Sequence, residues 1–404
     1  MPDFLMKIIS FLVSIISGIA LMFAPATEAI VKSTYEVANS FEQVQYGDDR
    51  LIPEKDEDGN WTFTTDRALK VVQITDFHIG GGSLSKKKDK KALNAVAAML
   101  AYEKPDLVIL TGDMVYPVPF QSGTFNNSIS TQIVIDFLEK LGVYYTVCFG
   151  NHDSELYATH DREAVSDMYA NPELKYSLYQ RGPKDIMGYG NQVIKVKNSD
   201  GIVTNAYFLF DSNTYTDGDL LGIFWKYDNI HDDQIAWYKE NVLAIDRANK
   251  EIDSHTPMFS SLAFFHIPLE EFGIAWNEYK ANGYNDTDNV QHIVGGFHED
   301  DEMSCCGVYP ENLFETMLEL GSTKGIFCGH DHVNNCHLKY KGISLVYGMS
   351  IDYLAYTDLD SNGAQRGCTV ISLTPDGDLS VSLENYYQDK YESKYEKEEV
   401  TMQW

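Results

Sequence analysis

The fold of this chain is decided by the stretch Leu69-Lys70-Val71-Val72-Gln73-Ile74-Thr75, which runs directly into Asp76-Phe77-His78 and then into three glycines. The first part is a β-branched apolar run of the kind that forms a buried strand, and the second part is a polar loop. A helix is expected next, at residues 91–103. The body of the chain therefore begins with a strand, a polar loop and a helix.

The same unit then recurs along the chain. A second strand is predicted over residues 106–111 and ends in Gly112-Asp113, and a helical stretch covers residues 130–141. A third strand over residues 143–149 ends in Gly150-Asn151-His152-Asp153. This alternation predicts an α/β fold with a parallel or mixed sheet, in which the carboxyl ends of the strands share one edge.

In the second half of the chain, strands and helices alternate less regularly. Strands are predicted over residues 192–196, 206–210, 258–265, 325–328, 344–347, 369–373 and 379–383, and helices over residues 232–246 and 311–320. The last two strands flank Pro375-Asp376-Gly377-Asp378, a hairpin signal that makes the end of the sheet antiparallel. One catalytic domain over residues 67–388 accounts for these elements. The tail over residues 389–404 is expected to form a surface helix or strap.

The composition limits the classes of function. The 404 residues carry 31 basic and 60 acidic side chains, which gives a net charge of −29. Broad binding to nucleic acid or to anionic membrane needs clustered cations, so a scaffold role on nucleic acid is excluded. Six cysteines in a chain of this length are too few for a fold built on disulfides.

Residues 1–26 have the features of a secretory signal peptide. Lys7 precedes an apolar run over residues 8–23, and the small residues of Ala24-Pro25-Ala26 follow. An uncleaved membrane anchor is the alternative, although the apolar run is short for a spanning helix. Either interpretation places the rest of the chain outside the cytoplasm, secreted or anchored through this segment. Residues 27–66 are polar and acidic and are expected to form a linker that leads into an edge strand or hairpin.

Acidic, amide and imidazole side chains collect at the predicted strand ends. They are Asp76, His78, Asp113, Asn151, His152, His266, His330 and His332. Residues i and i+2 of a strand share a face, so each Asp-x-His or His-x-His pair can point at one place. Oxygen and nitrogen donors without a thiolate suit Mn, Fe or Zn. These donors are too many for one ion, and two metals that share a carboxylate are a recurring device for phosphoester hydrolysis, so the sequence predicts a site for two divalent or trivalent metal ions.

In their order and spacing, these blocks resemble the calcineurin-like metallophosphoesterase superfamily. The resemblance rests on Asp76-x-His78, Gly112-Asp113, Gly150-Asn151-His152-Asp153, His266 and Gly329-His330-Asp331-His332, and it covers about residues 69–350. It implies a four-layer α/β/β/α sandwich of two mixed sheets flanked by helices, with a dimetal site at the carboxyl ends of the strands. The segments 228–237 and 263–270 look like the purple-acid-phosphatase-related branch, which includes fungal phosphatases and small plant members.

The resemblance also implies a role for each motif residue. Asp76, His78 and His332 would bind one metal, Asn151, His266 and His330 would bind the other, and Asp113 would bridge the two. His152 would be the catalytic general acid that protonates the leaving oxygen while a metal-bound hydroxide attacks phosphorus. Asp153 and Asp331 are expected to orient imidazoles.

One position departs from the purple acid phosphatases themselves. Those enzymes characteristically lack the first histidine and use a tyrosine of the second block as an iron ligand, whereas this chain has both His78 and Tyr116. One coordination position does not take both side chains, and His78 completes the ordinary ligand set. Tyr116 is therefore expected to pack beside the ligands. Absorption spectra of the iron-loaded protein should lack the purple tyrosinate-to-iron band.

The sequence thus predicts an exported, dimetal-dependent phosphoesterase that acts on phosphate esters, with a phosphomonoesterase favoured. A phosphodiesterase acting on cyclic nucleotides or glycerophosphodiesters is the alternative enzyme. A non-catalytic binding module is the third reading, and it is disfavoured because every ligand position and His152 are present. The run Lys86-Lys87-Lys88-Asp89-Lys90-Lys91 is expected to be a solvated helix start, with attraction of an anionic substrate as the alternative.

Overall fold

The computed structural model describes residues 24–219, 222–299, 302–359 and 363–401. The predicted signal peptide or anchor lies almost wholly outside these ranges, because residues 1–23 are not among them. Within the described ranges, no helix combines the length and the apolar content that crossing a membrane requires.

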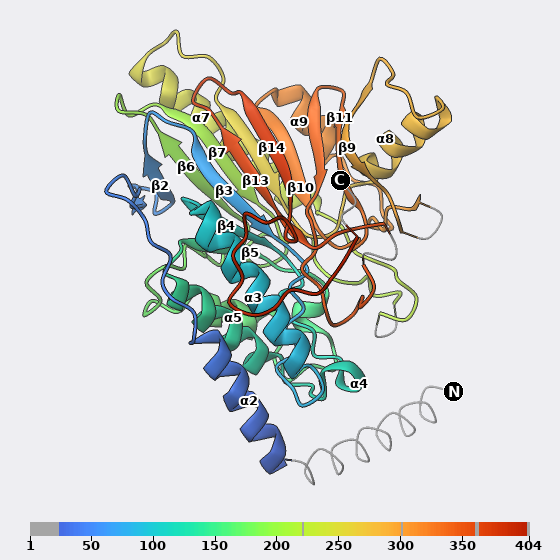
Figure 1. Ribbon diagram of the computed structural model, residues 1–404. Helices are drawn as coiled ribbons and strands as arrows, with labels where there is room; N and C mark the ends of the chain where they lie inside the picture. The colour runs from blue at the N-terminus through green and yellow to red at the C-terminus, as the bar shows by residue number, and fades with distance from the viewer. Residues whose placement is uncertain (1–23, 220–221, 300–301, 360–362, 402–404) are drawn as a thin grey trace.

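Two mixed sheets of described strands form the centre of the molecule (Figure 1). The smaller has the order β14-β13-β3-β4-β5, with bounds Leu379–Asn385, Gly367–Leu373, Leu69–Ile74, Leu107–Thr111 and Tyr145–Cys148. The larger has the order β1-β2-β6-β7-β8-β10-β12-β11-β9, with bounds Glu54–Lys55, Trp61–Thr64, Gln192–Lys197, Val203–Leu209, Ser260–Phe264, Thr323–Cys328, Ile343–Tyr347, Asn335–Tyr340 and Val290–Gly296. Strands β3, β4 and β5 are parallel, as are β7, β8, β10 and β12, so the carboxyl ends of each group meet at one edge of its sheet.

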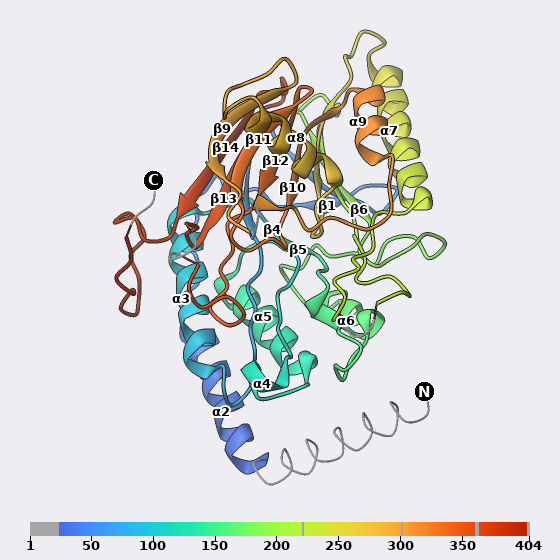
Figure 2. The same cartoon turned by 90° about the vertical axis from the view of Figure 1, so that its right-hand side faces the viewer.

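Helices cover the outer faces of both sheets (Figure 2). On the smaller sheet lie α3 (Lys86–Glu103), α5 (Asn127–Leu141) and α6 (Arg162–Tyr169), and α2 (Ala24–Ala38) packs on α3 and α5. On the larger sheet lie α7 (Asp232–Ile252), α8 (Glu270–Ala281) and α9 (Leu313–Leu320). The short helix α4 (Pro119–Ser122) and a single 3₁₀ turn (His152–Ser154) belong to loops.

The core follows from the alternation of side chains along the strands. In β3, Val72 and Ile74 pack under the helices, whereas Leu69 and Val71 pack between the two sheets. A third apolar layer joins the larger sheet to α7, α8 and α9. The predicted four-layer α/β/β/α sandwich of two mixed sheets is therefore confirmed.

Helix α2 stands where the sequence analysis expects the first part of a linker. The expected edge hairpin is present as β1 and β2, but residues 24–38 before it are helical. Ala38, Phe41 and Val44 are buried in the same core as α3 and α5. A few apolar side chains on one face are enough to dock a helix on helices that are already in place, so the polar composition of this segment conceals it.

Other elements differ from the predicted boundaries. Helix α3 begins at Lys86 and not near residue 91, so the lysine run forms its first turns, and the ammonium of Lys90 lies 3.8 Å from the centre of the Tyr395 ring. Helices α6 and α8 and strands β9 and β11 are not predicted. Strand β11 carries Asn335, His337 and Lys339 at every second position with apolar residues between them, a period-two pattern that could have indicated a strand.

The C-terminal tail forms a strap across α3, with no helix among its described residues 386–401. Tyr391 is buried, and its hydroxyl donates to Oε1 of Glu103 at 2.8 Å. Lys390 Nζ donates to the same oxygen at 3.2 Å. The packed body therefore continues on both sides of residues 67–388, through α2 and through this strap.

Candidate metal centre

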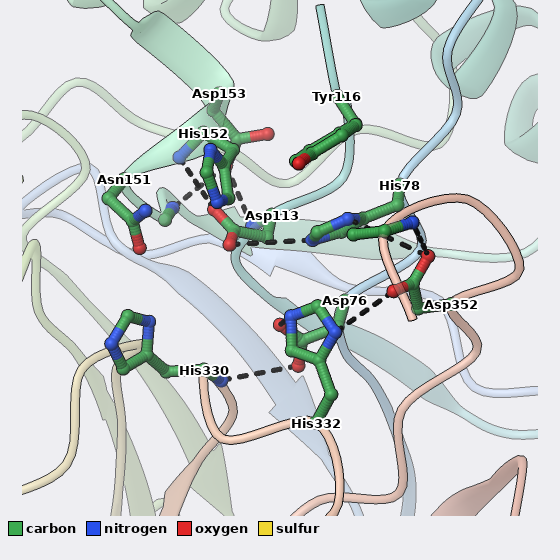
Figure 3. A network of polar contacts seen from close by, with 12 residues as sticks. Asp76, His78, Asp113, Tyr116, Asn151, His152, Asp153, His330, His332 and Asp352 are labelled. Carbon is green, nitrogen blue, oxygen red and sulfur yellow. Dashed lines mark hydrogen bonds and ion pairs between the residues drawn. The ribbon is translucent and has the colours of Figure 1, made fainter. Parts of the chain in front are cut away.

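The residues predicted for the site lie together at the carboxyl ends of the central strands (Figure 3). Asp76 and His78 follow β3, Asp113 follows β4, Asn151 and His152 follow β5, His266 follows β8, and His330 and His332 follow β10. The two sheets thus contribute to one site, and the structure brings together every ligand candidate that the sequence analysis names.

Four of the ligand candidates have a left-handed backbone. The angle φ is 49° at Asp76, 49° at His78, 53° at Asp113 and 76° at His330. This conformation costs a residue other than glycine about 1–3 kcal/mol, and it persists only where the surrounding structure imposes it. Strain is therefore concentrated in the loops that carry the ligand candidates.

The glycines of the motifs are required by close approach. A Cβ atom at Gly150 would lie 2.1 Å from Oδ1 of Asp113, and one at Gly329 would lie 1.9 Å from Oγ1 of Thr75. Gly112 has φ of 89°, and a Cβ atom there would meet the ring of His266 at 2.5 Å. Each glycine lets one ligand loop pass against another, which explains why a glycine precedes Asp113, Asn151 and His330.

Two groups of side chains could each hold a metal ion. One contains Asp76, His78, Asp113 and His332, and the other contains Asp113, His266 and His330. Within each group the ligand atoms all lie within 4.8 Å of one another. Asp113 belongs to both groups, and a shared carboxylate is suited to bridging two metals.

The donor atoms themselves indicate that cations belong here. Buried atoms without a hydrogen-bond partner include Oδ1 of Asp76, both ring nitrogens of His78, Oδ2 of Asp113, Oδ1 of Asn151 and Nε2 of His330. Buried polar atoms are nearly always paired, so such a concentration requires another partner. Carboxylate, amide and imidazole donors without a thiolate fit Mn, Fe or Zn. The residues present therefore fit two metal ions.

The electrostatics of the site keep Asp113 ionised. Burial alone would raise the pKa of Asp113, but the imidazoles of His266 and His152 hold this pKa well below its ordinary value. In return, although burial opposes it, Asp113 raises the pKa of His266 to about 9. His330 has the opposite shift, because burial and His266 hold its pKa well below the ordinary value. Asp113 is therefore ionised, and a cation that binds to His266 would have to displace the proton that this imidazole holds.

Asn151 is oriented by a tyrosine that the sequence analysis does not identify. Nδ2 of Asn151 donates to the hydroxyl of Tyr215 at 2.9 Å, which leaves Oδ1 without a hydrogen-bond partner. Tyr215 lies in the loop after β7, a strand whose end the sequence analysis does not search for site residues. The amide oxygen is thereby presented to the site.

His152 lies beside the bridging carboxylate but is not part of either ligand group. Its backbone N–H donates to Oδ1 of Asp113 at 2.8 Å, and its Nδ1 hydrogen-bonds Oε1 of Glu155 at 2.7 Å. Burial lowers the pKa of His152, but Asp113 and the hydrogen bond of Glu155 outweigh this and raise it. Glu155 is a further residue absent from the sequence prediction, although an acid three positions after the histidine is a signal that could have found it.

We expect the substitution Glu155→Gln to slow turnover about tenfold. The carboxylate that hydrogen-bonds Nδ1 of His152 and raises the pKa of this histidine is replaced by a neutral amide. The pKa of His152 should fall, so a histidine that acts as an acid loses its proton earlier and the alkaline limb of kcat moves to lower pH. Steady-state kinetics across pH measure both effects. Glu163→Gln, at an exposed position in α6, is the matched control, and an unchanged pH profile in the Glu155 variant would contradict the role given to this residue.

Asp153 binds backbone and not an imidazole, which corrects the role expected of it. Its carboxylate accepts hydrogen bonds from the N–H groups of Asp113, Met114, Val115 and Gly150, at 2.8–3.1 Å. It therefore ties the loop after β4 to the loop after β5, and it positions Asp113 through the main chain.

Asp331 also has partners other than an imidazole. Its Oδ2 accepts hydrogen bonds from the hydroxyl of Tyr347 at 2.7 Å and from the N–H of Cys305 at 3.0 Å. These contacts do not match the expectation that Asp331 orients an imidazole. Asp331 fixes the loop that carries His330 and His332 against β12.

We expect Asp153→Ala to lower the free energy of unfolding by about 3 kcal/mol or more, because four buried N–H groups lose their acceptor. Urea denaturation measures the change. Asp161→Ala is a suitable comparison, since Asp161 accepts one hydrogen bond as the N-cap of α6 and should cost about 1 kcal/mol. Equal losses in the two variants would show that the carboxylate of Asp153 does not hold the loops together.

Asp352 takes the orienting role that was assigned to the other two acids. Its Oδ2 is 2.9 Å from Nδ1 of His332, and its Oδ1 is 3.7 Å from Nδ1 of His78. Burial would raise the pKa of Asp352, but His78 and His332 outweigh this and lower it. Asp352 lies shortly after the end of β12, so a search of that strand end would have found it.

Tyr116 packs beside the ligands, as Figure 3 shows. Its ring stacks on that of His78 with centroids 4.8 Å apart and planes at 16°, and its hydroxyl donates to Oε1 of Gln121 at 2.9 Å. His78 belongs to the first ligand group, whereas the hydroxyl of Tyr116 is engaged by Gln121.

Comparison with known proteins agrees with this geometry. A model of the calcineurin-like phosphoesterase family matches residues 69–334. Over 326 residues, 73% of each chain, the protein is 27% identical to a probable inactive purple acid phosphatase 14 of Arabidopsis thaliana. Over 316 residues, again 73% of each chain, it is 26% identical to a probable inactive purple acid phosphatase 28 of the same plant. It is 25% identical over 301 residues to the phosphatase DCR2 of Saccharomyces cerevisiae, which covers 68% of this chain and 46% of that one. The protein therefore belongs to the calcineurin-like phosphoesterase family and, within it, to the branch related to purple acid phosphatases.

Proposed function

We propose that the protein is an exported, dimetal-dependent phosphomonoesterase. The observation that carries the proposal is the position of Asp113, which is shared by two ligand groups and lies next to His152. Two plant relatives are named probable inactive phosphatases, so the proposal of catalysis rests on the residues of this chain and not on theirs.

The metal ions would be held as the sequence analysis assigns them. Asp76, His78 and His332 would hold one ion, Asn151, His266 and His330 the other, and Asp113 both. Two cations in these places would supply positive charge for the phosphate and would lower the pKa of water.

The protein's own contribution to the reaction is a positioned proton. Glu155 occupies Nδ1 of His152, so the second nitrogen, Nε2, is left to face a substrate. When water adds to phosphorus and the ester P–O bond breaks, His152 donates its proton from Nε2 to the leaving alcohol oxygen, and the products are the alcohol and phosphate. The side chain of His152 is 24% exposed, which gives this proton access to the open side of the site.

The proposal is tested by hydrolysis of p-nitrophenyl phosphate beside bis-p-nitrophenyl phosphate. The full chain is loaded with Mn, Fe or Zn in separate preparations, and the metal content of each is measured. A higher kcat/KM on the monoester is the expected result. A higher value on the diester would make the protein a phosphodiesterase, and two bound metals without hydrolysis of either ester would favour a binding module.

The proposal that the protein is exported rests on residues 1–26 alone. The charged start, apolar run and small residues predict cleavage near Ala26. N-terminal sequencing of the protein recovered from the medium and from the cell tests this. A mature chain that begins close to residue 27 is expected, whereas an intact leader in a membrane fraction would indicate an anchor.

A further inference from the structure

The hydrogen bond between Asn151 and Tyr215 is one link of a longer series. Nδ2 of Asn151 donates to the hydroxyl of Tyr215 at 2.9 Å, and this hydroxyl donates in turn to Oε1 of Glu155 at 3.3 Å, the longest link. The same Oε1 is 2.7 Å from Nδ1 of His152. One phenol therefore connects a candidate metal ligand to the carboxylate that hydrogen-bonds His152.

The carboxylate of Glu155 fixes the direction of these hydrogen bonds. A carboxylate has no proton to give and can only accept, whereas a phenol has one proton to donate. Because Tyr215 donates that proton to Glu155, its oxygen is left to accept from Asn151. The two ends of an amide are told apart by their hydrogen-bond partners, and an acceptor selects the nitrogen end. The oxygen end of Asn151 must then face the other way.

The oxygen end of Asn151 faces the candidate metal centre. Asn151 is 1% exposed, and its Oδ1 has no hydrogen-bond partner among the described residues. In Figure 3 this oxygen lies on the side of His330, whose Nε2 is likewise buried without a partner. Cations take the amide oxygen of asparagine as a ligand, whereas a reversed amide would turn N–H donors toward the cation. The direction of one amide thus decides whether this position has its oxygen ligand.

The segment that carries Tyr215 is held in place without its hydroxyl. Tyr215 and Tyr227 form an antiparallel bridge, and their rings stack with centroids 5.6 Å apart. Nη2 of Arg162 donates to the carbonyl of Asn213 at 2.8 Å and to that of Gly150 at 3.0 Å. The main chain just before Tyr215 is thereby joined to the residue that precedes Asn151. Removal of the hydroxyl should therefore leave the ring where it is.

We propose that Tyr215 is a positioning residue through which Glu155 directs the amide oxygen of Asn151 at one metal ion. Glu155 then sets both this oxygen ligand and, by its own hydrogen bond, the imidazole of His152. The part that concerns His152 rests on the proposed function, whereas the part that concerns metal binding does not. We call the place of this ion the second metal position, and its ligand candidates are Asn151, His266, His330 and Asp113.

The variant Tyr215→Phe removes the hydroxyl and keeps the ring. Calorimetric titration of the metal-free full chain with Zn²⁺ measures the affinities of the two positions. One affinity should fall about 10–100-fold, the usual cost of losing a group that orients a ligand, while the other stays unchanged. Asn151→Ala identifies the second metal position, because it should weaken the same binding step. Unchanged affinities in the Tyr215→Phe protein would overturn the role given to this hydroxyl.

The double variant separates positioning from a general structural role. If Tyr215 acts through Asn151, then Tyr215→Phe should not weaken Zn²⁺ binding further in the Asn151→Ala protein. A hydroxyl that only stabilises the fold would weaken binding equally in both proteins. That result would contradict the positioning role.

The link to Glu155 is tested in the same way. The variant Glu155→Gln offers Tyr215 either an oxygen or an amide nitrogen, so the direction of the hydrogen bonds is no longer fixed. The second metal position should then weaken about tenfold. Loss of the negative charge by itself would also weaken cation binding, but it would do so in the Tyr215→Phe protein as well. We expect most of the loss to vanish there, and a loss of the same size would overturn the link through Tyr215.

Tyr46→Phe is the matched control, because it also removes one hydrogen-bonded phenol hydroxyl. The hydroxyl of Tyr46 donates to the carbonyl of Pro105 at 2.8 Å, and Pro105 precedes β4, at the end of that strand remote from Asp113. Both Zn²⁺ affinities should equal those of the unchanged protein. An equal loss in the Tyr46 and Tyr215 variants would contradict the specific role of Tyr215.

Hydrolysis is measured apart from metal binding. If the metal-loaded protein hydrolyses no ester, the proposed function fails, and the titrations still decide the role of Tyr215. If it does hydrolyse p-nitrophenyl phosphate, excess Zn²⁺ should bring kcat of the Tyr215→Phe protein close to that of the unchanged protein, since the hydroxyl orients a ligand. A kcat that stays low with both ions bound would show that Tyr215 acts on the reaction and not through Asn151.

Discussion

The protein with Asp113→Ala is expected to lose both metal ions and at least about 10³-fold in kcat/KM, since bound cations contribute several kcal/mol to such reactions. Asp113 is the residue common to the two ligand groups, and its Oδ2 is 3.1 Å from Nε2 of His266 and 3.5 Å from Nε2 of His78. Its removal therefore takes a ligand from each ion at once. Elemental analysis of the purified protein, with activity on p-nitrophenyl phosphate, measures the two losses together.

A buried acid at the other end of the same strand provides the control. Asp106, just before β4, accepts two hydrogen bonds from the guanidinium of Arg67 at 2.7 Å. Asp106→Ala should lower stability but leave two metals bound. An Asp113→Ala protein that still holds both ions would show that this carboxylate does not bridge them.

The second large effect is expected from His152→Ala, which should slow turnover about 10²–10⁴-fold while both metals stay bound. The size of the loss should depend on the leaving group. An alkyl alcohol needs a proton as it leaves, whereas p-nitrophenolate does not, so benzyl phosphate should lose much more in kcat than p-nitrophenyl phosphate. Kinetics on the two esters with the same metal-loaded preparation make this comparison.

His160→Ala is the control for that variant, because His160 lies on the same loop and its ring contacts Thr159. It should retain its activity and its metals. Equal losses on the two esters in the His152 variant would contradict proton donation to the leaving oxygen, and they would instead indicate a role in binding phosphate.

The sequence predicts those residues of the site that stand at the ends of strands. Asp76, Asp113 and His266 each come directly after an apolar run, and parallel strands bring such positions to one edge. Glu155, Tyr215 and Asp352 escaped this reasoning. Tyr215 and Asp352 hydrogen-bond ligand side chains that other loops carry, so their own sequence neighbours do not mark them. Glu155 differs, because its partner His152 lies three positions before it on the same loop.

The two acids whose role was misjudged both stand next to a histidine in a turn. Asp331 lies between His330 and His332, where His330 has φ of 76° and the chain is not extended. The carboxylate of Asp331 is directed at Tyr347 and at the N–H of Cys305, and that of Asp153 at backbone N–H groups. Proximity in the sequence was mistaken for proximity of the side chains.

Helix α2 was missed for a related reason, and the C-terminal strap was predicted only as one of two alternatives. Each buries only a few side chains, such as Ala38 and Tyr391, and each depends on α3 as the surface against which it packs. The helix-forming pattern is weak in such segments because tertiary contacts supply most of the stability.

The pairing of β3 with β13 sets the order in which the molecule can be made. The strand that carries Asp76 and His78 is held on one side by β4 and on the other by a strand that begins at Gly367. Asp352, which holds the imidazole of His332, has its own carbonyl bound by Nε of Arg366 at 2.8 Å. During synthesis from the N-terminus, neither partner exists until residues 366–373 have been made. We therefore expect metal binding to follow the pairing of these distant strands, which is a slow step because the contacts are far apart in the sequence.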